Sequence, residues 1–236
     1  MSQGPGCTLY LLWRTPPQKD VVSIPHAIEL KRTLFLNREM KIKKITLLII
    51  SVLVLGYAGL KGVKKVNLNS DYVIGQPLDS LNGVKVYYNG GVDHVLERNV
   101  TKDNYNLGLK YQCVEFVKRY YYEHYDHKMP DAYGHAKDFF DPKIKDGDLN
   151  QNRDLIQYTN SSKSKPEIGD LVIFSGSVLN RFGHVAIISK VSRNEIEIIQ
   201  QNPGPFSSSR EKIALKNQEG KYKIENSRLL GWLRKE

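Results

Sequence analysis

The sequence predicts an α+β domain that follows an apolar N-terminal helix, and three observations lead to this fold class. The 236 residues are 40% hydrophobic and 25% charged, which is ordinary globular composition and excludes collagen-like, coiled-coil and mostly disordered chains. A charge-free segment occupies residues 45–60. Further along, a helix-like pattern at 113–125 precedes a series of short β-branched segments. A helix followed by strands is typical of the α+β class.

The charge-free segment predicts a signal peptide or a membrane anchor over residues 40–65, with the retained anchor favoured. Lysines flank it on both sides: Lys41, Lys43, Lys44, Lys61, Lys64 and Lys65. Sixteen apolar residues are few for a span of about 20 but many for a signal core of about 7–15. A buried core helix stays open as an alternative. Residues 1–39 are interpreted as an N-terminal tail that is possibly not translated, because Met40 opens a signal-like segment.

The basic charge is concentrated in the first 65 residues. They hold eleven Lys and Arg against three Asp and Glu, whereas residues 66–236 hold 24 against 22. A nearly neutral body has no electrostatic footprint for a phosphate backbone, so we expect no nucleic-acid partner. The lysines that flank residues 45–60 instead fit a membrane partner.

The remaining chain divides into a linker and lead-in segment, 66–104, and a catalytic domain, 105–236. Loose alternation near Val84 and Val86 predicts a short strand or hairpin in the lead-in. In the domain, we expect a helix over 113–125 and then a loop-rich stretch from 127 to 165. Four strands complete a small antiparallel sheet, and the expected ranges are 171–174, 184–191, 195–201 and 229–233.

A three-residue hairpin loop, 192–194, sets the expected register of two of these strands. If Val191 faces Glu195, then His184 comes opposite Asn202, with Gln200 on its diagonal. The pattern therefore predicts that one imidazole meets two amide side chains at the edge of the sheet.

Cys113 is expected in the first turn of the predicted helix, where the helix dipole favours the thiolate and a protonated imidazole nearby would lower the thiol pKa further. A small buried hydrophobe is the alternative role. Four other histidines, His94, His124, His127 and His135, lack the spacing of metal ligands. We expect no metal and no organic cofactor.

Five short motifs resemble those of CHAP-domain cysteine amidohydrolases, a papain-like group related to NlpC/P60 proteins, and most of all the amidase domain of glutathionylspermidine synthetase/amidases. They are Tyr111-Gln112-Cys113-Val114-Glu115-Phe116, Gly169-Asp170-Leu171-Val172-Ile173, Gly183-His184-Val185-Ala186-Ile187, Gln201-Asn202 and Leu230-Gly231-Trp232. Their order and spacing, with 71 residues from Cys113 to His184 and 18 from His184 to Asn202, make chance a poor explanation. The resemblance implies a papain-like fold.

The resemblance also implies roles for individual residues. Cys113 would be the nucleophile and His184 the general base. Relatives read Glu-Gln-Asn where this chain reads Gln200-Gln201-Asn202, so a carboxylate is replaced by an amide. Either Gln200 or Asn202 would orient the imidazole, and Gln112 could donate to the oxyanion.

The implied function is hydrolysis of a peptide-type amide bond through an acyl-enzyme intermediate. Together with an exported or membrane-anchored N-terminus, this points to peptidoglycan as the partner, with a bacterial catalytic domain outside the cytoplasm. Two alternatives stay open. One is a glutathionylspermidine-type amidase that acts on a small conjugate, and the other is an inactive, membrane-tethered CHAP binding module.

Overall fold

The computed structural model describes residues 26–63, 66–91, 94–178 and 180–236. The chain divides into two units, 1–56 and 57–236. Residues 1–25 of the predicted tail lie outside the described residues.

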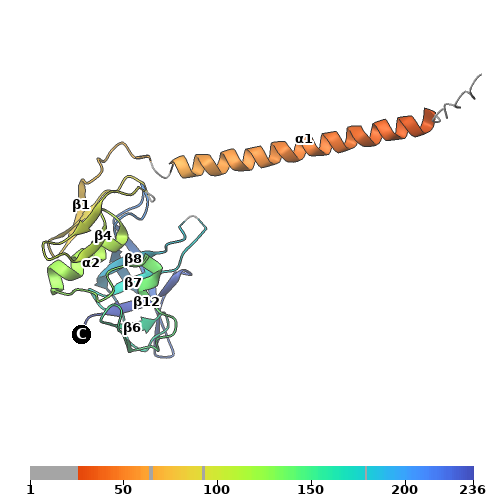
Figure 1. Ribbon diagram of the computed structural model, residues 1–236. Coiled ribbons are helices and arrows are strands. Elements are labelled where there is room, and N and C mark those ends of the chain that lie inside the picture. The colour runs from red at the N-terminus through yellow and green to blue at the C-terminus, as the bar shows by residue number, and fades with distance from the viewer. Residues whose placement is uncertain (1–25, 64–65, 92–93, 179) are drawn as a thin grey trace, which may run out of the picture. The chain divides into compact units, whose positions relative to one another are not determined.

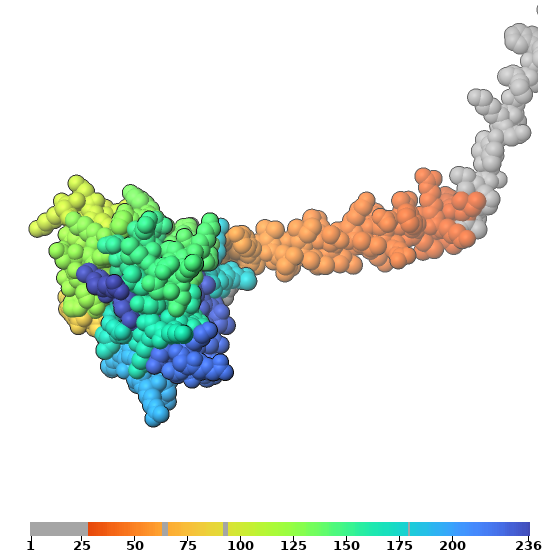
Figure 2. Space-filling view, turned by 90° about the horizontal axis from the view of Figure 1, so that it is seen from below, coloured from red at the N-terminus to blue at the C-terminus, as the bar shows by residue number. Residues whose placement is uncertain are grey.

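The N-terminal helix α1, His26–Val63, is longer than the segment that the apolar pattern predicts. It begins inside the predicted tail, because residues 26–39 contain many good helix formers. Its large apolar side chains are exposed along its length. Figure 2 draws the atoms of this helix in orange. Among the described residues it is the one helix that is long and apolar enough to cross a membrane. Its length and composition suit a membrane anchor or a signal segment.

An eight-stranded antiparallel sheet dominates the second unit (Figure 1), with the strand order β11-β10-β9-β8-β7-β12-β6-β5. Its strands are β5 Asp148–Asn150, β6 Leu155–Thr159, β7 Leu171–Phe174, β8 His184–Val191, β9 Glu195–Ile199, β10 Arg210–Gln218, β11 Lys221–Ile224 and β12 Leu229–Arg234. Two separate hairpins pair β1 Pro77–Leu81 with β2 Val84–Tyr87, and β3 Arg98–Val100 with β4 Asn106–Leu109.

The sheet is twice as wide as the sequence pattern predicts. The stretch expected to be loop-rich, 127–165, contains β5, β6 and the 3₁₀ helix η1, Ala136–Phe139. The strands β10 and β11 were also not expected, because their exposed face carries charged side chains and hides the alternation. The mixed α/β class is as predicted, but the small sheet is wrong.

The helix α2, Cys113–Tyr125, packs on one face of the sheet. Its fully buried apolar side chains are Phe116, Val117, Tyr120 and Tyr121, which follow a three-four spacing. They share a core with inward-facing residues of β7 and β8. Residues of alternate parity, such as Ala186 and Ile188, face a second core on the other side of the sheet. The helix start is thereby held against one end of β8.

The hairpin of β8 and β9 has the expected three-residue loop, but its register differs at the loop end. Val191 faces Ile196 and not Glu195. A bulge between Ile188 and Lys190 shifts the pairing by one residue, so that Ile188 faces Ile198 as predicted. The one-residue difference at the loop and the one-residue shift at the bulge cancel, so the pairing nearer to His184 is the predicted one.

Candidate active site

Cys113 is the first residue of α2, as its spacing predicts, and Gln112 is the N-cap. The backbone N–H groups of Val185, Val114 and Cys113 itself lie close enough to the sulfur atom to favour its charged form. Val185 directly follows His184, so the sulfur lies near the peptide bond that joins these two residues. The start of α2 and the start of β8 therefore meet, although 71 residues separate Cys113 from His184 in the sequence.

Gly183 allows His184 to start its strand at this point. Its φ is +77°, in the left-handed region that favours glycine, and a Cβ there would lie 2.5 Å from the carbonyl oxygen of Phe174. Any larger residue would have to push the start of β8 away from β7. The Gly-His pair of the sequence motif thus has a steric reason.

The imidazole of His184 contacts Gln200, one of its two candidate partners. His184 Nε2 lies 2.9 Å from Gln200 Oε1. Because an amide oxygen only accepts hydrogen bonds, Nε2 must carry the proton, and the Nδ1 of the neutral ring keeps a lone pair. Gln200 is itself buried, with 4% of its surface exposed. Of the two amide side chains that the sequence offered as partners of His184, Gln200 is therefore the one in contact with the imidazole.

Asn202 takes a different direction from the one that strand alternation predicts. The strand β9 ends at Ile199, and Asn202 has a φ of +57°, which breaks the alternation. Its Nδ2 donates to Gln112 Oε1 at 2.8 Å. Asn202 therefore ties the end of this segment to the residue that precedes the thiol.

Gln112, the predicted oxyanion donor, has both ends of its side chain in hydrogen bonds. Its Nε2 donates to the carbonyl of His94 at 2.7 Å, and its Oε1 accepts from Asn202. One hydrogen of the amide group is thereby directed at His94. Donation to an oxyanion by the second hydrogen stays a prediction.

A buried network that the sequence analysis missed joins α2 to the end of β9. Gln201, which is fully buried, donates to Gln112 O at 3.0 Å and to Glu115 Oε2 at 2.8 Å, and its Oε1 accepts the N–H of Tyr87. The other oxygen of Glu115 pairs with Arg119 Nε at 2.6 Å. Nearly all of these groups are enclosed, so their bonds act in a low dielectric. The only sequence signal for this network is an acidic residue and a basic residue four positions apart on a helix.

The pKa directions oppose the expectation of a thiolate. Burial raises the pKa of the Cys113 thiol, although three backbone N–H groups act against this shift. Burial also lowers the pKa of His184 to about 4, with the hydrogen bond to Gln200 opposing this and the charge of Arg228 adding to it. Desolvation therefore opposes the effect of the helix start and favours the neutral forms of the thiol and of the imidazole.

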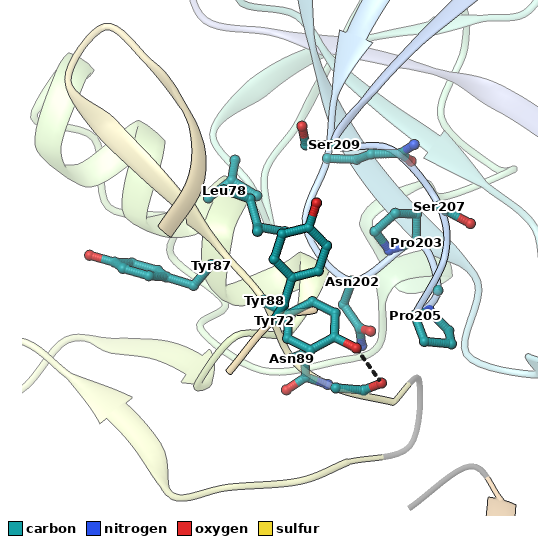
Figure 3. Close-up of a pocket in the computed structure, with 14 residues that line it drawn as sticks. Tyr72, Leu78, Tyr87, Tyr88, Asn89, Asn202, Pro203, Pro205, Ser207 and Ser209 are labelled. Carbon is teal, nitrogen blue, oxygen red and sulfur yellow. Dashed lines mark hydrogen bonds between the residues drawn. The ribbon is translucent and has the colours of Figure 1, made fainter. Parts of the chain in front are cut away.

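A pocket adjoins the two amides (Figure 3). Gln200 and Asn202 line it together with tyrosines such as Tyr72 and Tyr88, and its far wall is the loop with Pro203, Pro205, Ser207 and Ser209. The pocket thus lies between the lead-in segment and the chain that follows β9. In the part of the chain that the structure describes, no three metal-ligating side chains gather at one point.

Comparison with known proteins identifies a family domain within this chain. The family model described as "CHAP domain" matches residues 103–202. Trypanothione synthetase of Crithidia fasciculata is 33% identical over 117 residues, which are 49% of this chain and 18% of that protein. The bifunctional glutathionylspermidine synthetase/amidase of Escherichia coli K12 is 33% identical over 112 residues, 47% of this chain and 18% of that protein. This chain therefore spans about a fifth of the length of these relatives.

Solved structures show a weaker likeness. The crystal structure of Ly7917 with the hydrolyzing product of MDP matches with 16% sequence identity and a TM-score of 0.33, over 53% of this chain and 54% of that chain. This score is too low to support an argument. The family match, by contrast, contains Cys113, His184, Gln200 and Asn202. This protein carries a CHAP domain at residues 103–202.

Proposed function

We propose that this protein is a cysteine amidohydrolase of papain-like arrangement that cleaves a peptide-type amide bond in peptidoglycan. The observation that carries the proposal is the position of Cys113 at the start of α2, with its sulfur near the backbone N–H of Val185, the residue after His184. A nucleophile at a helix start beside an oriented imidazole is the arrangement that thiol acyl transfer requires.

The reaction would proceed in two balanced steps. In the first, the thiol proton moves to Nδ1 of His184 as the sulfur attacks the substrate carbonyl, and the imidazolium then protonates the leaving amine. A thioester remains on Cys113. In the second, His184 removes a proton from water, the hydroxide displaces the sulfur, and the acid product and the free thiol are released. The backbone N–H of Cys113, with the second amide hydrogen of Gln112, would stabilise the oxyanion.

The neutral resting pair fits this scheme. An imidazole with a pKa of about 4 is unprotonated at neutral pH and can act as a base there. The cost is a less reactive thiol at rest, since the proton must move during attack. Gln200 orients the ring but adds no charge to stabilise the imidazolium.

The choice of substrate follows from the N-terminal helix. The helix α1 suits a membrane anchor or a signal segment, and a domain carried across a bacterial membrane meets the amide bonds of the cell wall. We therefore place the catalytic domain outside the cytoplasm. The likeness to a protein named glutathionylspermidine synthetase/amidase favours a second candidate, an amidase that acts on a small glutathionylspermidine-type conjugate.

One experiment separates these functions. The full chain in detergent and its Cys113→Ala variant are each incubated with purified peptidoglycan and with glutathionylspermidine, and new primary amines are counted. We expect release from peptidoglycan by the wild type alone. Release from the conjugate alone would support the second candidate. No release from either substrate, with the domain folded, would leave the inactive binding module and end the proposal of hydrolysis. A Cys7→Ala variant, which removes the chain's other thiol, is the matched control and should keep full activity.

A further inference from the structure

The amide group of Gln200 is held at its nitrogen end as well as at its oxygen end. Nε2 lies 3.3 Å from the carbonyl oxygen of Ser208 and 3.4 Å from Glu211 Oε2. Both partners are acceptors, and neither carries a hydrogen that could be donated to the amide when Glu211 is a carboxylate. The two contacts are long, so each one is weak, but both favour the same direction of the amide, with its nitrogen toward the two acceptors.

The sheet register brings Glu211 to this position. The backbone N–H of Gln200 bonds to Ser209 O, and Glu211 pairs with Ile198 across β9 and β10. Glu211 is therefore the diagonal neighbour of Gln200 on the same face of the sheet. The carboxylate arrives from β10, a strand that lies beyond the residues matched by the family.

A reversed amide would be unfavourable in this setting. Its oxygen would then face the Ser208 carbonyl and the Glu211 carboxylate, and its nitrogen would face Nε2 of His184. That nitrogen would donate to Nε2 and move the ring proton to Nδ1. An imidazole with its proton on Nδ1 could not accept the proton of Cys113 at that atom. The direction of one amide thus decides whether the base is available.

We propose that Glu211 is a positioning residue which, with the Ser208 carbonyl, fixes the direction of the Gln200 amide and so the tautomer of His184. Glu211 touches neither the thiol nor the imidazole, and it acts through Gln200. The kinetic part of this inference rests on the proposed function, whereas the tautomer can be measured without turnover.

The test compares Glu211→Lys with Glu211→Gln in the full chain, labelled with ¹⁵N-histidine. Glu211 is exposed, so the fold should tolerate both changes. Lysine offers only donors and should favour the reversed amide, whereas glutamine keeps an oxygen that can accept. We expect the Nε2–H tautomer of His184 in the wild type and in Glu211→Gln. In Glu211→Lys the Nδ1–H tautomer should rise at least about tenfold, because lysine removes an acceptor and places a donor at the same position.

Two further measurements complete the test. Glu219→Lys, an exposed change of equal charge in the turn after β10, should leave the tautomer unchanged. With peptidoglycan as substrate, Glu211→Lys should lower kcat by about tenfold with KM unchanged. An unaltered tautomer in folded Glu211→Lys would overturn the inference. If that variant does not fold, Glu211→Leu, which removes the acceptor without a new charge, takes its place under the same criterion. A shifted tautomer without any wild-type turnover would uphold the positioning role and refute only the proposed function.

Discussion

Gln200 and Gln201 are adjacent in sequence, but they serve the site from opposite faces of the sheet. Gln201 is fully buried on the face that α2 covers, and it bonds directly to the Glu115 carboxylate at 2.8 Å. Gln200 lies on the other face, where its oxygen meets His184 and its nitrogen reaches Glu211 only at 3.4 Å. Gln201 joins the segment after β9 to α2, whereas Gln200 orients the imidazole of His184. Because their side chains have different partners just after the end of β9, two identical residues take these separate roles.

The largest expected effect is on stability, from Gln201→Ala. This change leaves a buried carboxylate oxygen of Glu115, the N–H of Tyr87 and the carbonyl of Gln112 without their present partner. We expect the free energy of unfolding to fall by about 4 kcal/mol, as for a broken buried charge network. Urea unfolding measures this loss. The exposed Gln218→Ala should change stability by less than about 0.5 kcal/mol. A similarly small loss of unfolding free energy in Gln201→Ala would show that the hydrogen bonds of this glutamine do not stabilise the fold.

The next effect is the pH dependence that His184 gives to stability. Its pKa is about 4 in the folded protein and 6.5 as the ordinary value, so the unfolded chain binds the proton more tightly. Stability is therefore fully present above pH 6.5 and is lost as the pH falls toward 4. The loss amounts to about 3 kcal/mol by linkage.

Unfolding of the wild type and of His184→Gln between pH 7 and pH 4 isolates this contribution, because the other histidines are common to both proteins. We expect the difference in stability between them to change by about 3 kcal/mol across this range. If the difference in stability between the two proteins stays constant from pH 7 to pH 4, the imidazole is not buried as a neutral ring. The surroundings of Gln200 would then be more polar than those of Gln201.

The elements that the sequence predicted well are those whose own residues determine them. The bounds of α2, β7 and β8 match the expected ranges, because each has a clear apolar pattern and a glycine or polar stop. The strands β10 and β11 alternate charged and apolar residues over a face that is only partly buried, so their pattern is weak. The role of Glu211 depends on the pairing of β10 with β9, which no local pattern contains.

The site shows the same division between local and tertiary information. The motif spacing placed Cys113 at a helix start and His184 at a strand start. It could not choose between Gln200 and Asn202, because the choice depends on one backbone angle, the φ of +57° at Asn202. The bulge near Ser189 could not be predicted either, since it is set by packing across β8 and β9. The pKa directions depend on burial, which needs the complete fold.

The third prediction concerns the reactivity of Cys113 in a site where an uncharged amide, Gln200, contacts the imidazole in place of a carboxylate. With a neutral thiol and a neutral imidazole, alkylation of Cys113 by iodoacetamide should accelerate about tenfold per pH unit, hence about 100-fold from pH 6 to pH 8. Gln200→Glu should flatten this profile, because a carboxylate would raise the pKa of His184 and stabilise the imidazolium beside a thiolate. Mass spectrometry of the alkylated peptide follows both proteins. A rate in the wild type that is already constant between pH 5 and pH 8 would indicate an ion pair and contradict the neutral pair.

The smallest effect separates the two amides that compete for the imidazole. Gln200→Ala removes the acceptor at 2.9 Å from His184 Nε2 and frees the ring to turn, so kcat on the substrate identified for the wild type should fall by about tenfold or more. Asn202→Gly keeps the left-handed backbone and removes the bond to Gln112, and it should lower kcat by less. Steady-state kinetics with both variants, checked for equal unfolding midpoints, decides the order. A greater loss of kcat in Asn202→Gly would assign the orienting role to Asn202. The different contacts of Gln200 and Gln201 would then matter for the structure but not for catalysis.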